Sequence, residues 1–128
     1  MAQILVIDDQ EEIRELLRRF LTSAGYDVLT ASNGRAGKKL FNADHVDLVI
    51  TDIFMPEEDG LETIMSMRQH HPDVKIIAIS GGGSLGNIDM LQAAKRLGAF
   101  RVFTKPFELE ALLEAVREAI PAPPAERT

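Results

Sequence analysis

Five short apolar runs recur along the chain, and each has the length and composition of a β-strand. The first, third and fourth runs are nearly uninterrupted Val, Ile and Leu, which is typical of strands buried on both faces of a sheet. The second run is only weakly amphipathic, which favours the edge of the sheet. The predicted strands are residues 4–7, 26–31, 47–50, 74–79 and 101–103.

Segments with helical spacing separate these runs. Apolar residues at i, i+3, i+4, i+7 and i+8 from Ile13 predict one helix, and similar spacing recurs from Leu109 to Ile120. A shorter helix is predicted at 61–68, and the patterns at 33–41 and 86–97 are weaker. Strands that alternate with helices indicate right-handed βαβ units. We therefore predict a doubly wound α/β fold with a parallel sheet and helices on both faces.

Composition and charge narrow the class of protein. The 128 residues suit one domain, which we place at residues 1–120, with the Pro-rich residues 121–128 as a tail or linker start. Without cysteine there is no disulfide framework or Cys-based zinc site. The net charge of −6 is the wrong sign for binding nucleic acid directly. No apolar run reaches the roughly 18 residues of a membrane span, and no signal peptide opens the chain, so we expect a cytoplasmic protein.

Polar residues follow four of the predicted strands. Asp8 and Asp9 follow the first strand, Asp52 and Ser80 follow the third and fourth, and Lys105 lies shortly after the fifth. In an open doubly wound sheet, ligands bind outside the carboxyl ends of the strands. The pattern therefore predicts that three carboxylates, a hydroxyl and an ammonium converge at one edge of the sheet.

These residue types indicate phosphoryl chemistry assisted by a metal ion. Three neighbouring carboxylates repel one another unless a cation lies among them, and hard oxygen ligands favour Mg²⁺. Because Mg²⁺ uses only one or two protein carboxylates, Asp52 is left to attack a phosphoryl group and become an aspartyl phosphate. Lys105 would pair with the phosphoryl oxygens and Ser80 would donate to another oxygen. The apolar residues 53–55 would limit access of water.

Four motifs resemble the receiver domain of a bacterial response regulator. They are "VIDDQEEIRELL", "VITDIFMPEEDGLE", "IIAISGGG" and "GAFRVFTKPF", which occur in the family's order, and the resemblance covers residues 3–120. It implies a flavodoxin-like sheet of five parallel strands in the order 2-1-3-4-5. We also expect a stand-alone regulator similar to the chemotaxis regulators, because nothing after residue 128 could bind DNA or catalyse a second reaction.

The resemblance assigns a role to each acid. Asp8 and Asp9 form an acidic Mg²⁺ pocket with Asp52, and the backbone carbonyl of Phe54 is a further metal ligand. Asp52 receives phosphate from the histidine of a histidine kinase or histidine phosphotransfer protein. The chain would thus be a signalling switch, not an enzyme, and would catalyse only its own phosphorylation and dephosphorylation.

The same resemblance identifies the switch. Ser80 and Lys105 contact the phosphate, and the Lys105–Pro106 peptide is expected to be cis. The family places Tyr or Phe three residues before the lysine, where this chain has Val102 with Phe103 beside it. How the switch operates without an aromatic residue at that position is left open.

The output surface also follows from the resemblance. It is built from the helix at 86–97, the strand at 101–103 and the helix at 109–120. Phosphorylation would change the binding of a downstream protein that the sequence does not identify. No direct partner is expected among nucleic acids or membranes, and homodimerisation through this surface is a further expectation.

Two other functions compete with this interpretation. A phosphohydrolase of the haloacid dehalogenase type needs Asp-x-Asp after its first strand, but Gln10 and Phe54 occupy the second position after Asp8 and Asp52. General acid catalysis would then lack its residue. A phosphorylation-independent binding module on the same fold would keep the shape and lose acids or the lysine. All five positions are intact, although Val102 keeps this alternative open.

Two further predictions concern the residues around the first helix start and the loop after the fourth strand. Asp9 and Glu12 have the spacing of a helix-capping pair, so a structural role for Asp9 is as well supported as a role in metal binding. Three consecutive glycines at 81–83 predict a mobile loop after the fourth strand.

Overall fold

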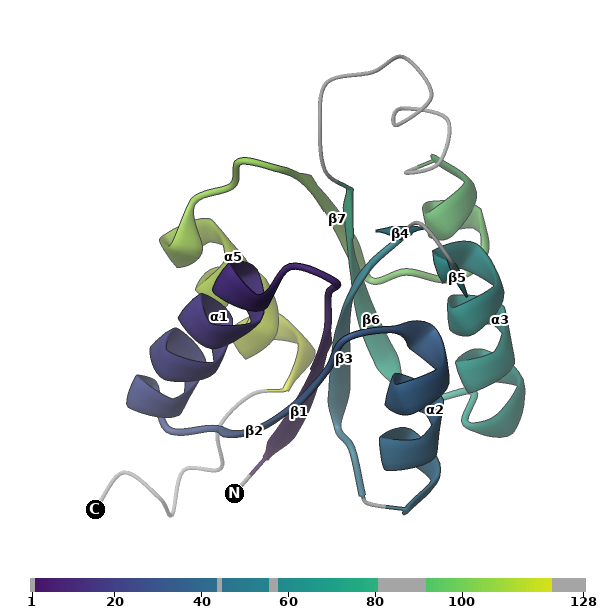
Figure 1. Ribbon diagram of the computed structural model, residues 1–128, viewed down its shortest axis with the longest axis horizontal. Helices are drawn as coiled ribbons and strands as arrows, with labels where there is room; N and C mark the ends of the chain where they lie inside the picture. The colour runs from purple at the N-terminus through teal and green to yellow at the C-terminus, as the bar shows by residue number, and fades with distance from the viewer. Residues whose placement is uncertain (1, 44, 56–57, 81–91, 121–128) are drawn as a thin grey trace.

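The structure is a computed structural model that describes residues 2–43, 45–55, 58–80 and 92–120; at 54, 55 and 58–60 only the backbone is described. Its centre is a sheet of five parallel strands in the order β2-β1-β3-β6-β7 (Figure 1). The order confirms the predicted flavodoxin-like arrangement and the edge position of the second strand. The strands are β1 (Gln3–Ile7), β2 (Asp27–Ala31), β3 (Leu48–Asp52), β6 (Lys75–Ser80) and β7 (Arg101–Thr104).

Helices cover both faces of this sheet. The helices α1 and α5 lie together on one face, while α2 and α3 lie on the other (Figure 1). Residues 92–96 are also helical, which agrees with the latter part of the pattern at 86–97. The weak pattern at 33–41 is a helix as well. The bounds are α1 (Glu11–Ser23), α2 (Gly34–Ala43), α3 (Gly60–His70) and α5 (Leu109–Ala119).

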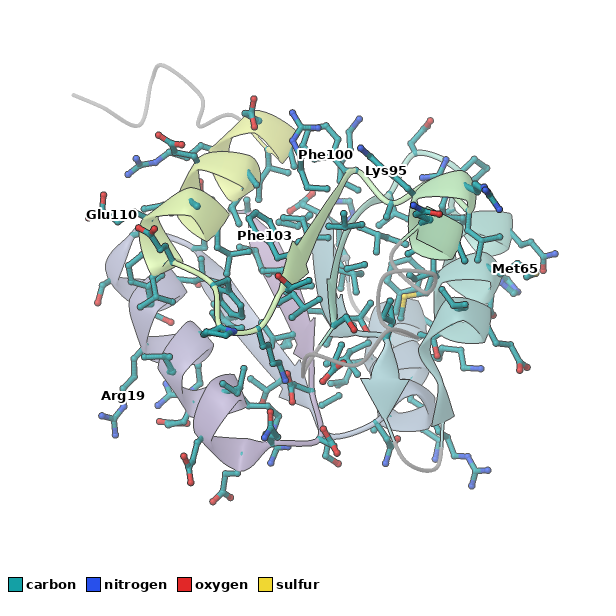
Figure 2. The ribbon with its side chains drawn as sticks, turned by 90° about the horizontal axis from the view of Figure 1, so that it is seen from above. Arg19, Met65, Lys95, Phe100, Phe103 and Glu110 are labelled. Carbon is teal, nitrogen blue, oxygen red and sulfur yellow. The ribbon has the colours of Figure 1, made fainter. Side chains whose placement is uncertain are left out.

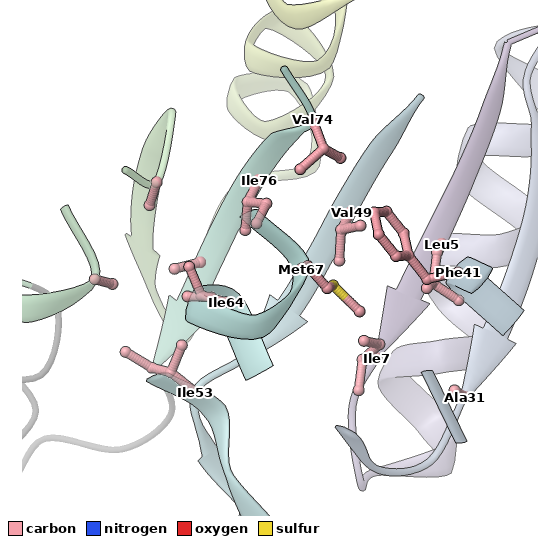
Figure 3. Close-up of a cluster of buried hydrophobic side chains, with 13 residues drawn as sticks. Leu5, Ile7, Ala31, Phe41, Val49, Ile53, Ile64, Met67, Val74 and Ile76 are labelled. Carbon is pink, nitrogen blue, oxygen red and sulfur yellow. The ribbon is translucent and has the colours of Figure 1, made fainter. Parts of the chain in front are cut away.

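The core consists of two apolar clusters, one on each face of the sheet. Side chains alternate along a strand, so Leu5 and Ile7 of β1 join one cluster while Ile4 and Val6 join the other. Figure 3 shows the first cluster, in which Leu5 and Ile7 lie with residues from α2, α3 and the neighbouring strands. All five residues of β3 are buried. The unbroken apolar runs therefore belong to strands buried on both faces, as predicted.

Gly37 has a packing role in α2. A Cβ atom at this position would lie 2.4 Å from Ile7 Cδ1, so any larger residue would require Ile7 or the helix to move. The sequence pattern at 33–41 indicated this helix only weakly. In the structure, Gly37 seats α2 directly against Ile7, the residue that precedes Asp8.

Two local features differ from the predictions. A two-stranded antiparallel ladder of β4 (Phe54–Met55) and β5 (Glu58–Asp59) precedes α3, where the sequence predicted no strand. Its two-residue strands are too short to produce an alternating pattern. The N-cap of α1 is Gln10, without a capping hydrogen bond from its side chain. The proposed capping by Asp9 is therefore wrong, because the helix begins one residue later than that spacing requires.

Two predictions fall on other parts of the chain. The loop at 81–83 and the tail at 121–128 lie outside the described residues. Within the described ranges, every helix is too short or too polar to cross a membrane.

Candidate functional site

The register of the sheet brings the predicted site residues together. Ile7 pairs with Thr51, which places Asp8 beside Asp52 at the ends of β1 and β3. On the other side of β3, Asp52 pairs with Ile79, the residue before Ser80. The Lys105 backbone N–H then donates to the Ser80 carbonyl at 2.8 Å. Asp52 thus lies at the end of a strand between the acidic pair that follows β1 and the Ser80 hydroxyl at the end of β6.

The Lys105 ammonium contacts three side chains of the site. Its Nζ lies 2.8 Å from Asp8 Oδ2, 3.0 Å from Asp52 Oδ2 and 2.7 Å from Gln10 Oε1. The side chains of Asp8 and Asp52 are only 2% and 3% exposed. Burial alone would lower the pKa of the Lys105 ammonium, but its bonds to Asp8 and Asp52 outweigh burial and raise that pKa above its ordinary value. The lysine is therefore a fixed positive charge in the site.

The three acids could hold a cation. One carboxylate oxygen from each of Asp8, Asp9 and Asp52 lies within 4.8 Å of the others, and the described ranges contain no other such group of potential ligands. The Gln10 backbone N–H donates to Asp8 Oδ1 at 2.8 Å, which orients the Asp8 carboxylate and leaves Oδ2 facing the site. All three ligand atoms are hard anionic oxygens, the type that Mg²⁺ prefers. The donor set fits Mg²⁺.

Ser80 carries an unsatisfied hydroxyl. The residue is completely buried, and among the described residues its Oγ is the only buried side-chain nitrogen or oxygen without a hydrogen-bond partner. Thr51 is equally buried, but its Oγ donates to the Asp52 carbonyl at 3.0 Å. A buried hydroxyl without a partner destabilises the fold, so Ser80 is placed to donate to a group that arrives at this edge.

The structure also describes the Lys105–Pro106 peptide and part of residues 53–55. The Lys105–Pro106 peptide is cis. Ile53 is buried in the core cluster between the sheet and α3, whereas the side chains at 54 and 55 lie outside the described atoms. Phe54 lies two residues after Asp52 in β4, and metal binding by its carbonyl stays a prediction.

Val102 and Phe103 point to opposite faces of the sheet. Val102 is half-buried and packs against the cluster that includes α3. Phe103 packs into the other cluster, on the side of α5 (Figure 2). Its ring centroid lies 6.3 Å from that of Phe107. Phe103 is therefore on the wrong face to replace the aromatic residue that Val102 displaces.

Gln10 is the site residue that the sequence analysis missed. From the sequence, Gln10 counted only as evidence against an Asp-x-Asp motif. In the structure, its side chain contacts the Lys105 ammonium. No sequence signal singled out Gln10, because the spacing from Asp9 to Glu12 predicted Asp9 as the N-cap of this helix. The contact itself joins residues 95 positions apart, which local patterns do not reveal.

The chain is similar to a large family of known proteins. The family described as response regulator receiver domain matches residues 4–117. Sporulation initiation phosphotransferase F of Bacillus subtilis is 33% identical over 119 residues, which cover 93% of this chain and 94% of that protein. The transcriptional regulatory protein GlrR of Escherichia coli is 35% identical over 93% of this chain, which spans only 26% of GlrR.

Solved structures agree with these relatives. The response regulator TrrA of Thermotoga maritima, in complex with Mg²⁺-BeF, superposes with a TM-score of 0.81 at 37% identity, covering 94% of this chain and all of that one. A receiver domain protein of Clostridium thermocellum gives a TM-score of 0.85 at 34% identity, covering 94% of each chain.

Proposed function

The chain belongs to the family of response regulator receiver domains, the phosphoacceptor switches of two-component signalling, and on this premise we propose that Asp52 is the residue that accepts the phosphoryl group. One observation carries the assignment. Asp52 is the buried acid that ends the strand between β1, which leads to Asp8, and β6, which ends at Ser80, and its Oδ2 lies 3.0 Å from the Lys105 ammonium. Asp9 is exposed, and Oδ1 of Asp8 accepts a hydrogen bond from the Gln10 backbone N–H.

In the proposed reaction, an Asp52 carboxylate oxygen attacks phosphorus and forms the new O–P bond. The P–N bond to the donor histidine breaks, and its electron pair returns to the imidazole nitrogen, which then takes a proton. Lys105 stabilises the negative charge on the equatorial oxygens, and the Ser80 hydroxyl donates to one of them. The chain thereby promotes its own phosphorylation without acting on a separate substrate.

Asp8, Asp9 and Asp52 are the residues that would hold Mg²⁺, with the Phe54 carbonyl as a further proposed ligand. When bound, Mg²⁺ supplies positive charge that screens the acids from one another and from the incoming phosphate. The partial burial of this cluster strengthens that attraction, because water screens it less.

Receiver domains interact with histidine kinases or phosphotransfer proteins, and we propose a partner of this class for this chain. The proposed output surface consists of residues 92–96, β7 and α5, which would bind a downstream protein or a second copy of the chain.

A cytoplasmic location stays a prediction. A phosphorylation-independent binding module is not favoured, because the site residues converge and the family match covers most of the chain.

Phosphorylation by a small acyl phosphate with Mg²⁺ tests the proposal, with intact mass as the measurement. We expect the parent chain to gain one phosphoryl group and Asp52→Asn to gain none. Asp47→Asn changes an acid at the opposite end of the sheet and should label like the parent. Failure of the parent to label, or equal labelling of Asp52→Asn, would overturn the assignment.

A further inference from the structure

The Gln10 side chain completes the set of acceptors around Lys105. An ammonium only donates hydrogen bonds, so the amide oxygen of Gln10 must be the atom that faces Lys105 Nζ at 2.7 Å. Lys105 also donates to Asp52 Oδ2 at 3.0 Å and forms an ion pair with Asp8 Oδ2 at 2.8 Å. The Lys105 ammonium thus has three oxygen neighbours, two of them charged and one neutral.

The position of Gln10 in α1 makes this contact notable. Gln10 is the N-cap of the helix, but its side chain makes no capping hydrogen bond. A serine, threonine, asparagine or aspartate would stabilise the helix start better. The side chain is therefore directed to Lys105 at the expense of the cap, while the backbone N–H separately orients Asp8.

Lys105 occupies the same carboxylates that a metal ion would need. It bridges Asp8 and Asp52, two of the three acids whose oxygens lie within 4.8 Å of one another. An ammonium and a divalent cation at these oxygens compete, because each requires the same negative charge. Any group that stabilises only the ammonium in this position must weaken metal binding.

We propose that Gln10 is a positioning residue that holds Lys105 in the acidic pocket and thereby sets the concentration of Mg²⁺ needed to displace it. The inference rests on the Mg²⁺ site of the proposed function. Gln10 acts through Lys105, because its neutral amide oxygen contacts the ammonium directly. It raises the Mg²⁺ requirement of the resting protein and does not take part in phosphoryl transfer.

Calorimetric titration of the whole chain with Mg²⁺, without a phosphodonor, tests this inference. Gln10→Met keeps the length of the side chain but removes the acceptor. We expect its Mg²⁺ Kd to fall by about threefold to tenfold, the effect of losing one hydrogen bond that favours the competitor. Gln69→Met, which changes an exposed glutamine of α3, is the matched control and should leave the Kd unchanged.

Two further variants separate this role from helix capping. Gln10→Ser is too short to reach Lys105 but can cap α1, so it should resist urea better than the parent and still bind Mg²⁺ more tightly. In a Lys105→Met background, Gln10→Met should no longer change the Kd.

An unchanged or higher Kd in Gln10→Met, or a shift that persists without Lys105, would overturn the inference and leave Asp52 labelling unaffected. Absence of Mg²⁺ binding by the parent would overturn both the inference and the proposed metal site.

Discussion

Both ends of the central sheet contain aspartates, but these are partly exposed at the amino end and buried at the carboxyl end. At the amino end, the Asp47 carboxylate accepts the Gln3 backbone N–H at 2.8 Å and contacts His45 Nε2 at 2.9 Å, and its side chain is 28% exposed. At the carboxyl end, Asp8 and Asp52 are almost completely buried and face each other across one lysine.

The difference shows what identifies a functional acid. Asp47 is satisfied by neighbours in sequence and by the adjacent strand, and water screens its remaining charge. Asp8 and Asp52 are buried close to each other, an arrangement that is unfavourable without a cation and that a fold does not need for stability. A hollow lined by His45, Asp47, His71 and Asp73 also occurs at the amino end, but these side chains do not form a ligand group like that of Asp8, Asp9 and Asp52 within the described ranges.

Removing the lysine should disrupt the carboxyl end most. Lys105→Met leaves two buried carboxylates without their cation, and we expect the free energy of unfolding without metal to fall by about 3 kcal/mol. Urea denaturation at pH 7 measures this free energy, and Lys39→Met, which changes an exposed lysine of α2, is the control. Added Mg²⁺ should recover much of the loss, and an undiminished stability without metal would contradict the importance of the ion pairs.

The pH dependence of that loss has a definite sign. In the folded state the pKa of Lys105 is raised above its ordinary value of 10.5. Its contribution to the free energy of unfolding is therefore complete below pH 10.5 and disappears only as pH rises through the folded pKa. The difference between the parent and Lys105→Met should therefore be constant from pH 7 to about pH 10 as far as this lysine is concerned.

The second largest effect should come from Asp8. Asp8→Asn keeps an acceptor for the Gln10 amide but removes a charge from the proposed metal site, so Mg²⁺ affinity should fall by at least about tenfold in calorimetry. Stability without metal should not fall greatly, because like-charge repulsion is relieved. An unchanged affinity would remove Asp8 from the set of ligands.

Ser80 and Thr51 offer a finer comparison of two buried hydroxyls. Ser80→Ala removes an unsatisfied group, so the free energy of unfolding should rise by about 1 kcal/mol while phosphorylation becomes slower. Thr51→Val removes a hydroxyl with a partner and should lower the free energy of unfolding by about 1 kcal/mol. If both variants lose stability equally in urea, Ser80 is satisfied in solution.

The smallest effect should occur at the amino end. Asp47→Asn weakens an exposed contact with His45, which we expect to change the free energy of unfolding by about 0.5 kcal/mol. Mg²⁺ affinity should stay the same. A clear loss of Mg²⁺ affinity would show that the two ends of the sheet are coupled.

The sequence predicted the strands and the converging residues because hydrophobic periodicity and the geometry of parallel sheets are regular, whereas the order of the strands followed from the resemblance to receiver domains. Asp8, Asp52 and Lys105 could be placed at one edge because each follows a strand. The Gln10 contact and the tight approach of Gly37 to Ile7 could not be predicted, since both depend on packing between distant segments. Likewise, the β4–β5 ladder is too short to leave a pattern.

The complete burial of β3 has a consequence for how a signal would spread. Asp52 ends a strand that is paired on both sides and buried at each of its five positions, so its backbone amides should exchange with deuterium only when the whole domain opens. Phosphorylation of Asp52 would thus modify the most rigid strand of the protein. Any structural response must be taken up by its periphery, where β7 is an edge strand of the described sheet and the Val102 side chain is smaller than an aromatic ring.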